Sequence, residues 1–165
     1  MFKINDYVIY GSNGVCRVEN IEKVSLRNKE LEYYILSPIF NIKMTIKIPV
    51  NNVSTAIREL MSKNQISDLI KNIQKNETFE FEDTRRRSEE YKSIIKTGNT
   101  EDIIKVINSI KMEKGEKESL GKKLNKTDED TMDIAIKKLY QEISIVLGIN
   151  VEEVGAYIKK ESILN

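Results

Sequence analysis

The sequence predicts an α+β protein in which a small strand-built barrel is followed by an all-helical domain of about five helices. Two observations predict this fold. Up to about residue 53, apolar residues alternate with polar ones and strand formers such as Val, Ile and Tyr are frequent. After Ser54, apolar residues recur at the spacing of amphipathic helices. We therefore expect one domain over residues 1–53 and a second over residues 54–165.

Four or five short strands account for the first domain. The segments that predict them are YVIY, VCRVENIEKVSL, LEYYILSPIF and KMTIKIPV. In the GSNG turn, Gly11 and Gly14 suit a tight reversal because glycine adopts a positive φ without a steric penalty. The polar stretch RNKE at residues 27–30 predicts a second turn. Pro49 ends the last strand because it has no N–H for a sheet ladder.

Apolar periodicity locates the helices of the second domain. Three segments each place their apolar residues on one helix face. These residues are Ile66, Leu69, Ile70 and Ile73, then Ile103, Ile104, Ile107 and Ile110, then Met132, Ala135, Ile136, Leu139, Ile143, Val146 and Leu147. Another helix is expected from about residue 83 or 84 to residue 97, with Tyr91, Ile94 and Ile95 buried.

Capping signals predict where helices begin, because an N-cap side chain accepts a hydrogen bond from a first-turn N–H. Asn99 with Asp102 predicts one start, and Thr127 with Asp130 predicts the next. A last short helix is expected from residue 150, with Glu153 at its third position. Residues 111–124, KMEKGEKESLGKKL, are charged and contain two glycines, which predicts a loop or a frayed helix end.

Composition argues against several classes of protein. The chain of 165 residues has no histidine and one cysteine, so the commonest general base and an internal disulfide are both missing. It also has no Gly-rich phosphate loop and no nucleophile elbow. We therefore expect a protein that is not an enzyme and has neither a cofactor nor a metal site. Cys16 is expected as a small buried apolar residue.

The same sequence predicts a cytoplasmic protein. No apolar run approaches the roughly 20 residues that a transmembrane helix needs. The N-terminal stretch MFKINDYVIY lacks the basic and then apolar layout of a signal peptide. We therefore expect no contact with a membrane.

The charges nearly balance, with 27 Lys and Arg against 26 Asp and Glu. Any nucleic-acid contact must therefore come from a local patch. The candidate is the run Arg85, Arg86, Arg87 at a helix start. Successive residues of a helix fan out by about 100°, so at least one arginine is expected to pair with acids such as Glu89 or Glu90. Taken alone, the run fits either a solvated helix start or a phosphate contact.

The order of these features resembles the CarD family of bacterial transcription regulators, also called CarD/CdnL-like. The resemblance rests on KINDYVIYGSNGVCRVENIE with its D-x-V-x-Y start, on ELEYYILSP, on MTIKIPVNN with its T-x-K-I-P ending, and on RR before IIKTGN. It extends from Met1 to about Leu147. The first domain is also similar to the polymerase-interacting module of transcription-repair coupling factors.

For the first domain, the resemblance implies a Tudor-like, or SH3-like, barrel that docks on the β subunit of RNA polymerase. Lys47 occupies the basic position of the family's closing strand. A second basic position falls near Val24, and Arg27 is close enough to take its place. Lys43 and Thr45 complete the expected polymerase-binding set, although the same residues also fit a plain solvated surface.

For the second domain, the resemblance implies contact with promoter DNA upstream of the melted region and an effect on open-complex stability. The family's W-x-R-R pattern falls on Thr84, Arg85, Arg86 and Arg87, so threonine replaces the tryptophan that wedges into the minor groove. Threonine is too small and too polar to unstack a base step. The expected contacts, to the minor groove and the phosphate backbone, are these four residues and Lys92.

Phe79 or Phe81 is a candidate replacement for the missing ring, although an aromatic residue just before a helix more often packs as a hydrophobic staple. The alternative function is that of a protein-interaction adaptor whose helical domain binds another protein or dimerises. A monomer is the favoured state. The sequence leaves open whether transcription is activated or repressed.

Overall fold

The computed structural model describes residues 1–26, 29–41, 43–51, 57–73, 75, 77–97 and 99–164. The chain divides into two compact units, Met1–Leu60, here the strand unit, and Met61–Asn165, here the helical unit. Strands make up the first unit and helices the second, which confirms the predicted α+β class. The expected boundary between residues 53 and 54 falls outside the described residues. A strand at Ile57–Glu59, which the sequence analysis omitted, extends the first unit.

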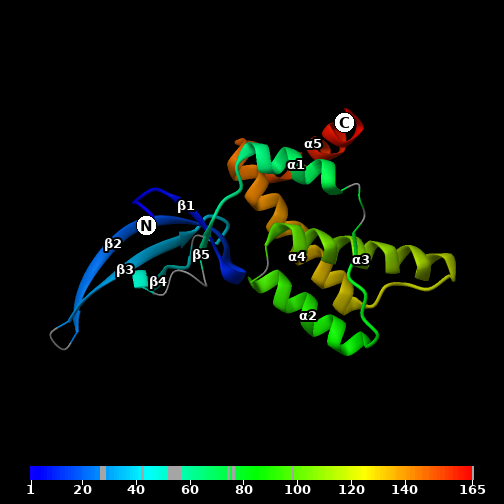
Figure 1. Ribbon diagram of the computed structural model, residues 1–165, viewed down its shortest axis with the longest axis horizontal. Helices are drawn as coiled ribbons and strands as arrows, with labels where there is room; N and C mark the ends of the chain where they lie inside the picture. Colours follow the sequence, from blue (N-terminus) through cyan, green and yellow to red (C-terminus); the bar gives the residue numbers. More distant parts are fainter. Residues whose placement is uncertain are drawn as a thin grey trace. The chain divides into compact units, whose positions relative to one another are not determined.

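The strand unit is an antiparallel sheet of five strands in the order β4-β3-β2-β1-β5 (Figure 1). The strands are β1 Tyr7–Tyr10, β2 Gly14–Leu26, β3 Lys29–Pro38, β4 Ile46–Pro49 and β5 Ile57–Glu59. A register shift between Val18 and Asn20 leaves Glu19 as a bulge, which bends the long β2. The bent sheet surrounds an apolar core made by Val8, Cys16, Val18, Tyr34, Leu36 and Ile57.

The turn between β1 and β2 has the predicted chemistry. Gly11 and Gly14 have φ of 43° and 71°, and a short 3-10 turn, Gly11–Asn13, separates them. A side chain at either position would be strained. The GSNG stretch therefore sets the reversal that places β1 beside β2.

Cys16 is buried in the core of the strand unit, which confirms its prediction as a small apolar residue. Burial disfavours the thiolate and raises the pKa of the thiol from 9.0 to about 11. The contribution of the thiol to stability is therefore fully present below pH 9 and is lost as the pH rises towards 11.

We expect a thiol reagent at pH 8 to label Cys16 much more slowly in the folded protein than in urea. We also expect the free energy of unfolding to decrease less between pH 8 and pH 10.5 for Cys16→Val than for the parent protein. Urea titrations at the two pH values measure this difference, in which the shared titration of lysines and tyrosines cancels. Equal labelling rates in the two states would contradict the prediction.

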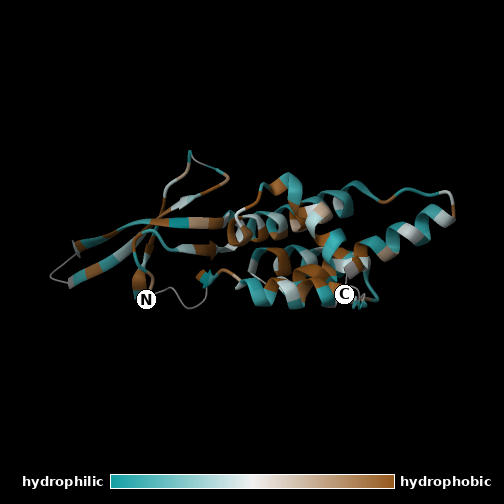
Figure 2. Ribbon diagram, turned by 90° about the horizontal axis from the view of Figure 1, so that it is seen from above, coloured by the Kyte–Doolittle hydropathy of each residue, from teal (hydrophilic) through white to brown (hydrophobic). Residues whose placement is uncertain are grey.

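The helical unit has five helices, α1 Lys63–Ile73, α2 Thr84–Thr97, α3 Thr100–Ser119, α4 Lys126–Leu147 and α5 Val151–Leu164. Helices α2, α3 and α4 pack on one another, and α1 and α5 pack together on α4 (Figure 1). Hydrophobic residues gather where helices face each other (Figure 2). None of the helices in the described ranges has the length and apolar character needed to cross a membrane.

The predicted apolar stripes form the core of the helical unit. Its buried members include Ile66, Leu69, Ile70, Tyr91, Ile103, Ile104, Ile107, Ile110, Ala135, Leu139 and Ile143. The remaining predicted members pack against this core while partly exposed, namely Ile73, Ile94, Met132, Ile136, Val146 and Leu147. The helical periodicity of the sequence is therefore confirmed at every position that it singled out.

Two of the three predicted helix starts are confirmed. The side chain of Asn99 accepts a hydrogen bond from the N–H of Asp102 at 2.9 Å. The N–H of Asn150 donates to the carboxylate of Glu153 at 2.9 Å. Each pair satisfies a backbone group at the start of its helix.

The third start was predicted wrongly, and so was the larger part of the charged segment, whereas residues 120–124 form the expected connection between helices. Helix α4 begins at residue 126 because the side chain of Asn125, not Thr127, caps it by accepting from the N–H of Asp128 at 2.8 Å. Residues 111–119 continue α3 instead of forming a loop. Gly115 costs the helix about 1 kcal/mol but does not end it. Ion pairs along α3 support the helix until Gly121, which has a φ of 68°.

Candidate nucleic-acid interface

The first turn of α2 carries the three arginines, and their side chains point in different directions. Asp83 starts the helix, since its side chain accepts the N–H of Arg85 at 2.8 Å and its carbonyl accepts the N–H of Arg87 at 2.9 Å. Arg85 and Arg86 are exposed, whereas the side chain of Arg87 is 14% exposed. The expectation that the three arginines cannot share one face is confirmed.

Four of the predicted DNA-binding residues lie on the solvent side of the helix. Thr84, Arg85, Arg86 and Lys92 are all exposed, and we call them the outward face of α2. The guanidinium of Arg85 lies 3.6 Å from the carboxylate of Glu89, with side chains 89% and 71% exposed. The expected local pairing is thus present. An exposed pair of this kind is weak and does not prevent Arg85 from binding another anion.

Arg87 turns inward and joins three helices. Its Nη1 contacts Glu113 of α3, and its Nη2 lies 2.7 Å from Asp128 of α4. Its guanidinium also lies 5.8 Å from the ring centroid of Tyr91, whose hydroxyl pKa is raised by burial. The partners expected from the sequence were acids beside the triplet, such as Glu89 or Glu90. The spacing of Arg87, Tyr91 and Ile95, four residues apart each time, was the signal for a position on the buried face.

Further lysines, which the sequence analysis did not single out, follow at the end of α3. Lys122 and Lys123 are exposed between α3 and α4. They lie between Glu113 and Asp128 in the chain, the two acids that Arg87 bridges. Lys126 pairs with Asp130 at 2.8 Å, and this hydrogen bond raises its pKa. The start of α2 and the start of α4 lie close together, since Arg87 contacts Asp128 (Figure 1).

Phe79 and Phe81, the candidate replacements for the missing tryptophan, are engaged by the helical core. The rings of Phe81 and Tyr91 meet edge to face, with their centroids 5.6 Å apart and their planes at 82°. Phe79 and Phe81 are 6.1 Å apart, and the N–H of Phe79 donates to Ser109 at 2.8 Å. Both rings stabilise the segment that leads into α2.

On the strand unit, one predicted polymerase-binding residue, Lys47, lies on an edge strand of the sheet. Lys47 lies on β4, an edge strand, with its Nζ 2.6 Å from the carboxylate of Glu22 and 5.3 Å from the ring centroid of Tyr33. Lys43 and Thr45 precede β4 and are exposed. Arg27 lies outside the described residues. Two exposed cations, Lys43 and Lys47, thus lie close together in the chain at and before β4.

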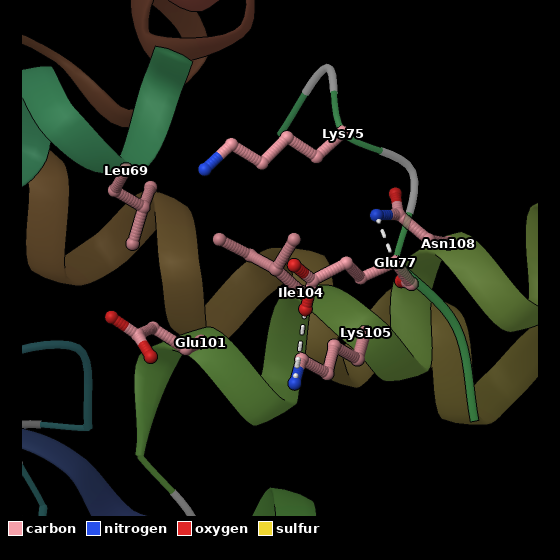
Figure 3. A pocket seen from close by; sticks show the side chains of 7 residues that line it. All are labelled: Leu69, Lys75, Glu77, Glu101, Ile104, Lys105 and Asn108. Atoms are coloured by element: carbon pink, nitrogen blue, oxygen red, sulfur yellow. Dashed lines mark hydrogen bonds and ion pairs between the residues drawn. The ribbon is translucent and has the colours of Figure 1, made fainter. Parts of the chain in front are cut away.

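The helical unit also has a cleft of about 100 Å³ (Figure 3). Its lining residues are Leu69, Lys75, Glu77, Glu101, Ile104, Lys105 and Asn108. Glu77 pairs with Lys105 at 3.1 Å, which raises the lysine pKa, and its carbonyl accepts from Asn108 at 3.3 Å. Two lysines and two glutamates balance each other, so this cleft has little attraction for a polyanion. Among the described residues, no three His, Cys, Asp or Glu side chains group as metal ligands would.

Comparison with known proteins finds similarity to a domain family and to a relative. Residues 2–61 match the family model described as the CarD-like/TRCF RID domain. A Bacillus subtilis (strain 168) protein named "Putative transcription factor YdeB" is 23% identical over 158 residues, which are 95% of this chain and 99% of that protein. The family match covers the strand unit, and the longer alignment continues through the helical unit.

Proposed function

We infer that the chain acts in transcription, since its residues 2–61 belong to the CarD-like/TRCF RID domain family. We propose that the strand unit binds the β subunit of RNA polymerase and that the helical unit contacts promoter DNA upstream of the melted region. The observation that carries this proposal is the match of the family segment to a compact unit with its own core. The similarity to a protein named as a transcription factor over almost the whole chain also supports it.

The polymerase contact is assigned to the edge of β4. The side chain of Lys47 is 45% exposed, and its ammonium is held by Glu22 and lies over the ring of Tyr33. A lysine held in this way can meet an acidic surface with little further loss of conformational freedom. Lys43 and Thr45 are exposed just before β4 in the chain, and we assign the contact to these three residues together with Arg27.

Lys47→Glu is expected to weaken capture of the polymerase β subunit by the full-length chain about tenfold or more, equivalent to about 1.4 kcal/mol. The change reverses a charge at the proposed contact and places two carboxylates together across β3. Pull-down or interferometry with the purified β subunit measures it. Lys23→Glu is the matched control, since Lys23 also pairs across the sheet, with Glu32 at 3.7 Å. Equal losses in both variants, or no loss, would remove Lys47 as an anchor.

The DNA contact is assigned to the outward face of α2. Exposed arginines at a helix start can reach phosphates and a narrow minor groove. With Thr84 in place of the family tryptophan, the contact is electrostatic and does not wedge a base step open. Such a contact is weak in isolation. Docking of the strand unit raises the local concentration of the helical unit near the duplex, and a weak contact then suffices to change the stability of the open complex.

Replacing Arg85 and Arg86 together by alanine is expected to reduce promoter binding in the presence of polymerase. Each phosphate contact contributes about 0.9 to the slope of log affinity against log salt, so the slope should fall by about 1 to 2. Titration of a labelled promoter fragment at several salt concentrations measures this. Lys159→Ala with Lys160→Ala, two exposed cations of α5, is the control. Unchanged affinity and slope with polymerase binding retained would favour the adaptor function instead.

A further inference from the structure

The structure separates the three arginines by their surroundings, and this separation has a functional meaning if the proposed DNA contact holds. We propose that Arg87 is a positioning residue that does not touch DNA. It holds the first turn of α2 against α3 and α4, so that Arg85 and Arg86 present their guanidinium groups to the duplex. The inference therefore rests on the proposed function and changes the role that the resemblance implied for Arg87.

The guanidinium of Arg87 contacts two helices at once. Arg87 reaches Glu113 of α3 with Nη1 and Asp128 of α4 with Nη2. A planar guanidinium presents its donors in a fixed fork, so two carboxylates from different helices are held at a defined angle. A lysine in the same place would be a single point charge without that geometry. Arg87 thus fixes how three helices meet.

Glu113 and Asp128 have other partners that hold them in place. Glu113 also accepts from Lys117 one turn later, at 2.7 Å. Asp128 accepts from the amide of Asn125 at 2.6 Å, and its own N–H donates back to Asn125 at 2.8 Å. The carboxylates are therefore set by α3 and α4 themselves. Arg87 is the group that α2 contributes.

Arg87 and its two acid partners are largely shielded from solvent. The side chains of Arg87, Glu113 and Asp128 are 14%, 19% and 1% exposed. For a phosphate to bind Arg87, the guanidinium would have to leave Asp128 unpaired in the interior, which is strongly unfavourable. Arg85 and Arg86 have no such constraint. Both are exposed, and the ion pair described for them joins Arg85 to the exposed Glu89.

The rest of α2 is held by other contacts. Tyr91 and Ile95 are buried in the helical core. Near the end of α2, the ammonium of Lys138 on α4 donates to the carbonyl of Ile95. The first turn lies between these contacts and the packed ring of Phe81, and within it Arg87 is the residue whose side chain reaches α3 and α4. The direction of Arg85 and Arg86 then follows, since they precede Arg87 by about 200° and 100° around the helix.

The first experiment compares Arg86→Met with Arg87→Met in the full-length chain, using polymerase and labelled promoter DNA at several salt concentrations. Both changes remove one charge from adjacent positions of one helix. We expect Arg86→Met to lower the salt slope by about 0.9. We expect Arg87→Met to weaken binding severalfold at every salt concentration without changing the slope, and to speed amide hydrogen exchange in the first two turns of α2. An equal drop in slope for both variants would overturn the inference.

A second comparison uses the acid partner. Glu113→Gln removes a negative charge, and Glu116→Gln, on the exposed side of α3, is its matched control. If Arg87 positions α2 through Glu113, Glu113→Gln weakens promoter binding relative to Glu116→Gln. If Arg87 contacts DNA, Glu113→Gln releases the guanidinium and strengthens binding, which would overturn the inference. Arg87→Lys keeps the charge without the fork, and it should reproduce the weakening in milder form.

Failure of the proposed function remains distinguishable from failure of this inference. If replacement of Arg85 and Arg86 leaves promoter binding unchanged, the proposed DNA contact is wrong, and the presenting role of Arg87 is overturned with it. Hydrogen exchange of Arg87→Met, measured on the protein without DNA, then judges the anchoring role alone. Exchange in α2 equal to that of the parent protein would overturn the anchoring as well.

Discussion

Arg87→Ala is expected to lower the free energy of unfolding of the helical unit by about 3 to 5 kcal/mol. The change leaves Asp128, which is 1% exposed, without its cationic partner in the interior. It also removes the link between α2 and Glu113. Urea unfolding followed by far-ultraviolet circular dichroism measures the loss. Arg86→Ala, one position earlier and exposed, is the control and should change stability by less than about 0.5 kcal/mol.

A double-mutant cycle tests whether the loss comes from the pair itself. Asp128→Ala and Arg87→Ala should each be strongly destabilising. The loss in free energy of unfolding for the double variant should be clearly smaller than the sum of the two single losses. With both side chains removed, neither member of the pair remains as an unpaired buried charge. Additive losses would show that Arg87 and Asp128 act independently and would contradict the assigned role of the ion pair.

Ile143→Ala is expected to cost the helical unit about 2 to 5 kcal/mol, through lost burial and the cavity that remains. Ile143 is 0% exposed at the centre of the core that α4 contributes, whereas Ile163 on α5 is 76% exposed. Ile163→Ala therefore serves as the control and should have little effect. Because the two units have separate cores, the amide resonances of the strand unit should keep their unfolding midpoint. A parallel shift of both units would contradict this.

Much of the fold could be predicted because its signals are local. The apolar stripes need only a period of 3.6 residues, and the caps at Asn99 and Asn150 act over three residues. The strand at Ile57–Glu59 has three residues, too few for an alternating pattern, and it is defined by pairing with the distant β1. The length of α3 was missed because Gly115 suggests a break, whereas ion pairs one turn apart, Glu113 with Lys117 and Lys114 with Glu118, span it.

The candidate site was predicted in part for the same reason. Pairing of Arg85 with Glu89 follows from a spacing of one helical turn. The partners of Arg87 lie 26 and 41 residues further along the chain, so they depend on how α2, α3 and α4 pack. A run of identical residues in the sequence thus contains two kinds of arginine. Only the contacts between helices tell them apart.

The division into two units with separate cores has a genetic consequence under the proposed function. A variant such as Ile143→Ala would lose its helical unit and still occupy the polymerase with an intact strand unit. It would therefore compete with the wild-type product in a cell that makes both. Lesions in the helical half would then be dominant, whereas lesions that collapse the strand half, which cannot reach the polymerase, would be recessive.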